Sequence, residues 1–204
     1  MRTFLQRLAQ GWRAWVKLLS RTEPAVGWAL FRIGIGLCLL YSLVSVAAVG
    51  LLDFFWLDLE YGGYRELGPV KVLMLDLGPA SPALVHGVYT VALLGTLAMT
   101  IGIGGRFATF AAMQGFLALS TLNTQCIGSD EGMLSNALWL LFLCDGSSTL
   151  SLRSKLRCGR WVTDTQVNAW ARYLAVFQLL VVYTFAGLNK TNSSWVPGGD
   201  MDGI

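Results

Sequence analysis

The chain alternates long apolar runs with short polar segments. A helix needs about 20 consecutive apolar residues to cross the hydrocarbon layer of a bilayer, so runs of this kind are typical of membrane spans. They predict spans at residues 25–52, 83–103, 107–122, 132–144 and 170–188. Because two of these runs fall short of about 20 residues, we expect the connector 123–131 to dip into the membrane or the bilayer to thin beside it. The predicted fold is all-α, a polytopic integral membrane helical bundle of about five transmembrane helices.

A different periodicity marks the first 22 residues. Apolar side chains recur there at steps of three and four residues, at Phe4, Leu8, Trp12, Trp15 and Leu19. Basic residues lie between them, at Arg2, Arg7, Arg13, Lys17 and Arg21. This pattern predicts a basic amphipathic helix in the cytoplasmic interface of the membrane, with a short cytoplasmic stalk as the alternative. The predicted domains are therefore an interfacial helix at 1–22 and a transmembrane domain at 23–204.

Charged residues make up only 13% of the chain, against roughly a quarter in soluble proteins, and this shortage favours a membrane protein. Basic residues gather before residue 25, at Arg106 and at 153–160, whereas acidic residues dominate 53–76 and 130–131. Because cytoplasmic loops attract lysine and arginine, we expect a multi-pass protein with a cytoplasmic N-terminus and an exoplasmic C-terminus. The net charge of +3, sorted to one side in this way, points to membrane lipids as partners and gives no indication of nucleic-acid binding.

The segment between the first two apolar runs, residues 53–82, mixes aromatic residues with glycine and proline. We expect it to form an interfacial cap that contains short helical pieces. His86, at the outer start of the second run, is expected to pack or to lie at the interface. Since this is the only histidine and the four cysteines are scattered, the sequence gives no metal-ligand set, and we expect no metal.

Polar residues inside the apolar runs are costly and therefore informative. Arg32 lies roughly 12 Å into the first run at 1.5 Å per residue. It could extend to the cytoplasmic side beside Trp28 or form a structural ion pair with Asp145, and we favour the ion pair. Three amide side chains are expected to form interhelical hydrogen bonds: Gln114, Asn136 and Gln178.

Two ionisable residues near the predicted outer ends of spans are the candidates for catalysis, Lys190 and Asp130. Lys190 shares a helix face with Ala186 and Gly187, and such small residues allow another helix to approach closely. A lysine enclosed in this way loses hydration, which disfavours the charged ammonium and allows the amine to act as a base. The alternative is a lysine that reaches the outer headgroups. Asp130 begins the fourth run, where the helix dipole stabilises a carboxylate without any chemistry.

The segment 183–201, YTFAGLNKTNSSWVPGGDM, resembles the vitamin K-dependent gamma-glutamyl carboxylases and their microbial relatives, the horizontally transferred transmembrane (HTTM) domain proteins. The shared pattern is an Ala-Gly-aliphatic-x-Lys run followed by Trp-Val-x-Gly, matched by Ala186, Gly187, Lys190, Trp195, Val196 and Gly198. Looser similarity extends from about residue 25 to the end of the chain, and includes residues 31–34, 130–145 and 160–164. In two places the sequence departs from the family. Ser129 and Asp130 stand where the animal carboxylases carry an Asn-His pair, and the chain ends at Ile204, where the family continues with further spans, so we expect a truncated domain.

The resemblance implies a quinone-dependent carboxylation or oxygenation with Lys190 as the base. In the family, the matching lysine deprotonates reduced vitamin K (the hydroquinone). Carbon dioxide is then added to a glutamate of a secreted peptide or protein, and quinone epoxide is left. The alternative is a non-enzymatic membrane helper in the maturation or export of a secreted peptide, similar to other HTTM-like proteins. The microbial relatives lead us to expect a bacterial plasma membrane.

Overall fold

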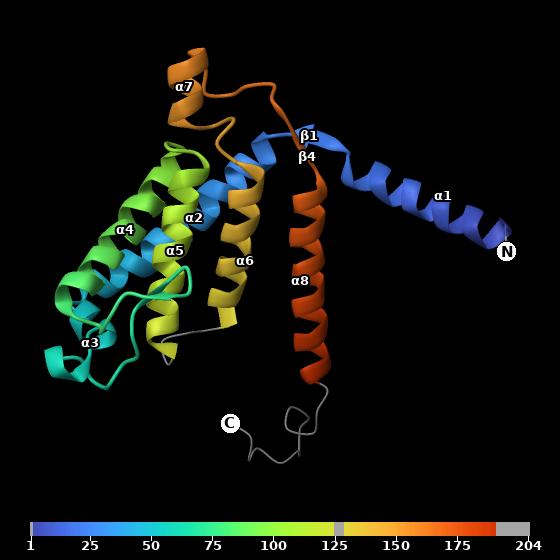
Figure 1. Cartoon of the computed structure of the whole chain (residues 1–204). Coiled ribbons are helices and arrows are strands. Elements are labelled where there is room, and N and C mark those ends of the chain that lie inside the picture. The colour runs from blue at the N-terminus through green and yellow to red at the C-terminus, as the bar shows by residue number, and fades with distance from the viewer. Residues whose placement is uncertain (1, 125–128, 191–204) are drawn as a thin grey trace. The chain divides into compact units, whose positions relative to one another are not determined.

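The computed structural model describes residues 2–124 and 129–190 (Figure 1). The chain divides into two compact units. One, the bundle unit, is Glu23–Val167, and the other, the terminal unit, combines Met1–Thr22 with Asn168–Ile204. Strands β1 (Thr22–Pro24) and β4 (Gln166–Asn168) form a two-stranded sheet. The predicted sequence domains, with a boundary after residue 22, stay a prediction.

Four helices form the core of the bundle unit: α2 (Val26–Ala48), α4 (Pro82–Ile101), α5 (Arg106–Leu122) and α6 (Ser129–Cys144). Helix α2 packs on α4 and α6, and α5 packs on the same two helices, so the four form a closed ring of contacts. Their facing sides bury residues such as Leu39, Met99, Met113 and Leu138. Close van der Waals packing of these side chains holds membrane helices together, since lipid is as apolar as the side chains themselves.

Small residues let α4 and α5 approach each other closely. A Cβ atom at Gly95 would lie 2.6 Å from the backbone nitrogen of Ala112, and one at Gly115 would lie 2.6 Å from the Cβ of Ala92. Such contacts between small residues are the usual means by which membrane helices pack tightly. They also fix the register of the pair, since Gly115 lies beside Ala92, near the middle of α4.

Arg32 is buried in α2, with 2% of its surface exposed. Its Nη1 donates to the carbonyl oxygen of Gly146 (3.0 Å) and its Nη2 to that of Leu150 (2.6 Å). The carboxylate of Asp145 instead lies 3.5 Å from Nη1 of Arg153. The predicted ion pair between Arg32 and Asp145 is therefore not a direct contact, although the Asp145 carboxylate is near enough to attract the guanidinium electrostatically. The loop after α6 curls through left-handed conformations at Asp145 (φ 46°) and Leu150 (φ 47°), and its carbonyl oxygens receive the guanidinium in place of a carboxylate.

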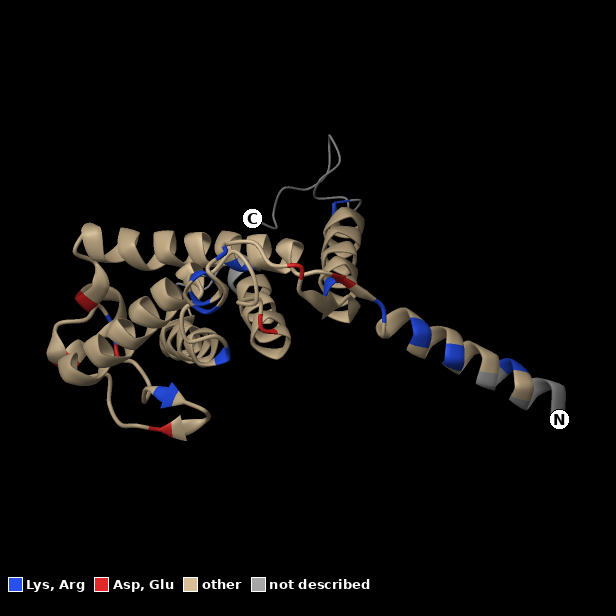
Figure 2. Ribbon diagram, turned by 90° about the horizontal axis from the view of Figure 1, so that it is seen from above, with Lys and Arg blue, Asp and Glu red and all other residues tan. Residues whose placement is uncertain are grey.

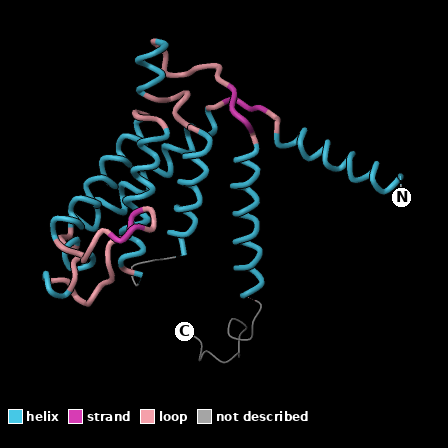
Figure 3. Tube along the Cα trace, viewed as in Figure 1, coloured by secondary structure: helices cyan, strands magenta, loops and turns pink. Residues whose placement is uncertain are grey.

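The segment between α2 and α4, termed the cap, contains the short helices α3 (Leu52–Trp56) and η1 (Leu59–Tyr61), as expected. It also contains a hairpin that the sequence did not predict, formed by the antiparallel strands β2 (Lys71–Val72) and β3 (Leu75–Asp76). Figure 3 shows this hairpin in magenta. His86 Nε2 lies 2.7 Å from Asp53 Oδ1, which ties α4 to α3.

Gln114 of α5 accepts a hydrogen bond from the backbone N–H of Leu73 in the hairpin (3.3 Å). The expectation of an interhelical partner for Gln114 is therefore wrong, because the hairpin reaches this side chain. The expected interhelical bonds of Asn136 and Gln178 stay a prediction. Helix α7 (Leu152–Cys158) follows the loop after α6 and is capped by the Ser151 hydroxyl, which accepts from the N–H of Ser154.

The terminal unit contains α1 (Arg2–Leu19) and α8 (Trp170–Asn189). The N–H of Ala169 donates to the carbonyl oxygen of Arg21 (2.8 Å), which joins the two segments. Most large apolar side chains of α8 are exposed, for example Phe177 (61%) and Phe185 (62%). Exposure of so many apolar side chains is unfavourable in water and favourable in contact with lipid.

All five predicted spans coincide with helices, within a few residues at each end. By length and apolar composition, α2, α4 and α8 qualify as candidate membrane spans. Helix α5 has 17 residues, and the apolar part of α6, Gly132–Cys144, is shorter still. Figure 2 shows long tan stretches of helix, with charged residues gathered mainly in loops, at helix ends and along α1. The mostly helical membrane class is confirmed.

Candidate functional site

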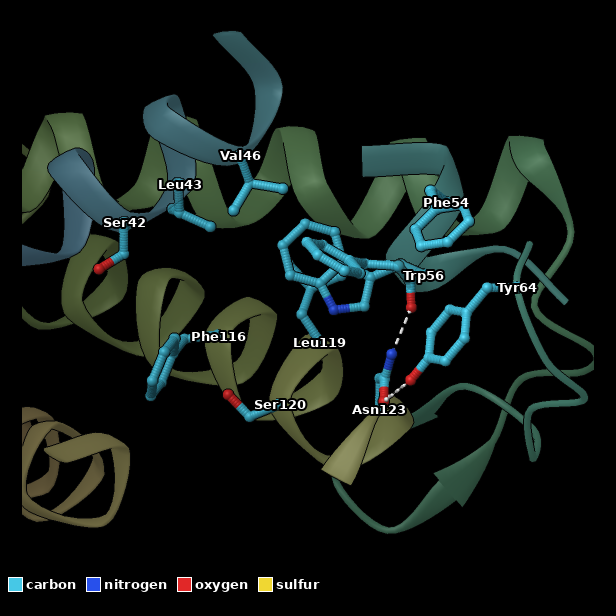
Figure 4. Close-up of a pocket in the computed structure, with 11 residues that line it drawn as sticks. Ser42, Leu43, Val46, Phe54, Trp56, Tyr64, Phe116, Leu119, Ser120 and Asn123 are labelled. Carbon is cyan, nitrogen blue, oxygen red and sulfur yellow. Dashed lines mark hydrogen bonds between the residues drawn. The ribbon is translucent and has the colours of Figure 1, made fainter. Parts of the chain in front are cut away.

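A cavity of about 550 Å³ lies between α2, α5 and the cap (Figure 4). It is mostly apolar, and its size is within the range of small-molecule sites in proteins, roughly 300–1,000 Å³. The residues that line it are Ser42, Leu43, Val46, Phe54, Phe55, Trp56, Tyr64, Phe116, Leu119, Ser120 and Asn123. The side chains thus come from three segments that are distant in sequence.

Asn123 forms the polar edge of the cavity. It follows the last turn of α5 and is buried, with 1% of its surface exposed. Its Oδ1 accepts from the hydroxyl of Tyr64 (3.1 Å), and its Nδ2 donates to the carbonyl oxygen of Phe55 (2.7 Å). The orientation of the amide follows from these two partners. Asn123 therefore fastens the cap to the C-terminal end of α5 at the edge of the cavity.

Aromatic rings of the cap form one wall. The rings of Phe54 and Tyr64 are stacked, with centroids 5.2 Å apart, and Phe55 meets each of them edge-on at 5.7 and 6.4 Å. Stacked and edge-on rings are favourable and rigid, so this wall is preformed. Ser42 and Ser120 add hydroxyl groups on α2 and α5. Flat apolar walls with a few hydroxyl and amide groups suit a planar aromatic ligand that carries one or two polar oxygens.

The residues predicted as catalytic lie elsewhere in the sequence. Lys190 ends α8, where its backbone N–H donates to the carbonyl oxygens of Ala186 (3.3 Å) and Gly187 (3.2 Å). Its side chain is exposed, and a Cβ at Gly187 would meet nothing within 4 Å. Asp130 lies in the first turn of α6, and its side chain falls outside the described residues. Trp195, Val196 and Gly198 of the matched motif also fall outside them. The catalytic roles of Lys190 and Asp130 stay a prediction.

Sequence reasoning missed the cavity residues, Asn123 and Tyr64 above all. One signal was available, because Asn123 directly follows an apolar run, where a polar side chain either faces water or forms a hydrogen bond within the protein. Its partners lie 59 and 68 residues away, so the sequence could not identify them. Among residues 2–124 and 129–190, no group of three or more His, Cys, Asp or Glu residues could hold a metal ion.

The model of the HTTM domain family matches residues 21–204. No solved structure matches the chain. The HTTM domain is a membrane domain family associated with vitamin K-dependent carboxylases. The match covers the bundle unit together with α8, including the segment around Lys190. The chain belongs to the HTTM domain family.

Proposed function

We propose that this protein carries out a quinone-dependent carboxylation or oxygenation in the membrane, with the ring of reduced vitamin K in the cavity under the cap. The observation that carries the proposal is the cavity itself, which combines about 550 Å³ of mostly apolar space with one polar edge. A naphthoquinone ring is planar and apolar apart from its two oxygens. The residues present therefore fit the group.

In this proposal, the apolar side chains of Phe54, Phe116 and Leu119 hold the ring. The Ser42 hydroxyl donates to the carbonyl oxygen of Cys38 (3.2 Å), so it would accept from a hydroquinone hydroxyl, and Ser120 adds a second hydroxyl. When bound, reduced vitamin K supplies an oxidisable hydroquinone whose reaction with oxygen drives removal of a proton from the γ-carbon of glutamate. Overall, hydroquinone, oxygen, carbon dioxide and glutamate would give quinone epoxide, water and γ-carboxyglutamate. The substrate class is a glutamate-containing secreted peptide or protein.

Lys190 is proposed as the general base, with Nζ accepting the proton of a hydroquinone hydroxyl. Asp130 is the second candidate catalytic residue, at the start of α6. A general base contributes about 10²–10⁴ to the rate of a reaction, so its loss is readily measured. The match of the family model through the Lys190 segment supports this role.

The proposed topology has five spans, with α5 and α6 crossing beside α2 and α4. The contacts of α5 and α6 with α2 and α4 support this topology. Helix α5 also packs against the middle of α4, where Gly115 lies beside Ala92. Basic segments before residue 25, at Arg106 and at 153–160 support a cytoplasmic N-terminus, with α1 in the interface. Five antiparallel crossings would bring the cap, the start of α6 and Lys190 to the exoplasmic side.

The test is epoxide formation by the purified protein in liposomes, supplied with reduced vitamin K, oxygen, bicarbonate and a glutamate-containing peptide. We expect epoxide from the wild type, and a loss of about 100-fold or more in Lys190→Ala, in line with the removal of a general base. Lys155→Ala is the matched control, since Lys155 is an exposed lysine of α7 and should leave the rate unchanged. Ser42→Trp, which places a bulky side chain at the cavity wall, should weaken quinone binding.

Equal epoxide formation in Lys190→Ala and wild type would remove Lys190 from the reaction. A wild type that makes no epoxide and co-purifies with a small secreted peptide would overturn the enzymatic proposal in favour of the maturation helper.

A further inference from the structure

The tip of the β2–β3 hairpin presents large apolar side chains on the surface of the bundle unit. Met74 is 96% exposed, Leu75 65% and Leu73 56%. Leu77, beyond β3, is 49% exposed, whereas Val70, before β2, is buried. A soluble domain would rarely present four large apolar side chains together at one turn. Exposure of these side chains is unfavourable in water and favourable in an apolar surrounding.

The hydrogen bond between Leu73 and Gln114 gives the depth of this tip. Gln114 precedes Gly115, and Gly115 packs against Ala92. Ala92 lies near the middle of α4, a helix long and apolar enough to cross a membrane. The tip is thus level with the central turns of a membrane span, although the hairpin belongs to the cap. Figures 1 and 3 show the hairpin alongside α5, away from its ends.

The residue types at the turn agree with this depth. Leu73 and Met74 both have positive φ angles, 53° and 64°, in a two-residue hairpin turn. Such turns normally select Asn-Gly, because asparagine and glycine adopt left-handed conformations most easily. Leucine and methionine adopt them with strain. Apolar residues at this turn are explained if the tip lies in hydrocarbon, where an asparagine side chain would need a polar partner.

Several backbone groups of the hairpin form hydrogen bonds within the protein. In lipid, backbone that is not helical must find its hydrogen bonds within the protein. The ladder supplies bonds from the Val70 N–H to the Gly78 carbonyl oxygen and from the Leu77 N–H to the Val70 carbonyl oxygen, both 2.9 Å long. Gln114 supplies the acceptor for Leu73 at the turn. The charged side chains of Lys71 and Asp76 are exposed and pair with each other at 3.7 Å, at the end of the ladder away from the turn.

We infer that the β2–β3 hairpin is a re-entrant element whose tip, Leu73–Leu75, contacts lipid acyl chains in the leaflet on the cap side. The partner is the bilayer hydrocarbon and not a protein surface, because the hairpin packs on α5, whose exposed Phe107 (85%) lies two helical turns before Gln114 on the same side of the helix. The inference depends on α4 and α5 lying in a membrane and is independent of quinone chemistry.

The experiment places an environment-sensitive fluorophore on Met74→Cys in the full chain, with the four native cysteines replaced by alanine. The protein is reconstituted in phosphatidylcholine nanodiscs that carry a quencher either at the headgroup or deep in the acyl chain. Iodide serves as the aqueous quencher. Leu75→Cys is a second tip position in case the first variant is not monodisperse, and Glu66→Cys, exposed in the cap, is the matched control.

We expect the deep quencher to act on the Met74 and Leu75 labels several-fold more strongly than the headgroup quencher, and iodide to act on the Glu66 label alone. Quenching of the tip labels by iodide to the same extent as the Glu66 label would overturn the inference, since the tip would then lie in water. Tip labels shielded from both iodide and lipid quenchers would also overturn it, since protein and not lipid would cover the tip.

Discussion

Replacement of Arg32 by methionine should strongly destabilise the bundle unit. The guanidinium links α2 to the loop after α6 through hydrogen bonds to the carbonyl oxygens of Gly146 and Leu150. A Cβ at Gly102 would lie 2.7 Å from Nη1 of Arg32, so the side chain also contacts the end of α4. Hydrogen bonds to a charged group contribute about 1.5–3 kcal/mol each. Methionine retains most of the apolar stem but leaves both carbonyls without this donor, so we expect a loss of about 3–5 kcal/mol.

For a chain of this size, such a loss corresponds to a Tm lower by roughly 10 °C. The assay is thermal unfolding of the detergent-purified protein, followed by cysteine exposure or by loss of the monodisperse peak. Arg157→Met, at an exposed arginine of α7, is the control and should shift Tm by no more than about 1–2 °C. If Arg32→Met melts together with the wild type and the control, the reasoning about this buried link is refuted.

Two further predictions concern helix packing and the cap. Gly95→Val should separate α4 from α5 and reduce the yield of monodisperse protein, because a Cβ there would lie 2.6 Å from the backbone of Ala112; a normal yield and Tm would contradict the close approach. Hydrogen bonds from the backbone N–H groups of Leu67 and Glu60 hold the pKa of the Asp58 carboxyl below its usual value of 3.8. A lowered pKa means that Asp58 stabilises the cap above pH 3.8, and that this contribution is lost as the pH falls through the lower pKa of the folded state. Hydrogen exchange of the cap against pH should show this acid opening in the wild type, whereas Asp58→Asn should lack that pH dependence.

The helices of this protein could be predicted from the sequence because the signal is local. Three of the apolar runs are long, and the ends of all five are marked by polar residues or glycine, so the sequence predicts each helix to within a few residues. The partner of Arg32 could not be predicted. The depth of the arginine was evident, but its acceptors depend on how the loop 145–150 turns its carbonyl oxygens.

The hairpin and the cavity could not be predicted, for two physical reasons. Leu73 and Met74 carry no turn signal, since their type usually marks helix or core and their left-handed conformation is imposed by the surrounding structure. The cavity forms only when α2, α5 and the cap pack together. Its polar edge depends on the hydrogen bond between Tyr64 and Asn123, which are 59 residues apart in sequence.

The measurement that tests the central claim most directly is photolabelling of the reconstituted protein with an azide-bearing naphthoquinone, followed by peptide mapping. The account predicts labels on α2 near Ser42 and on α5 at residues 116–120. These labels should disappear with excess unlabelled quinone and weaken in Ser42→Trp. Labelling that excess quinone does not displace, or labels confined to segments that do not line the cavity, would contradict the claim that the cavity under the cap binds a quinone.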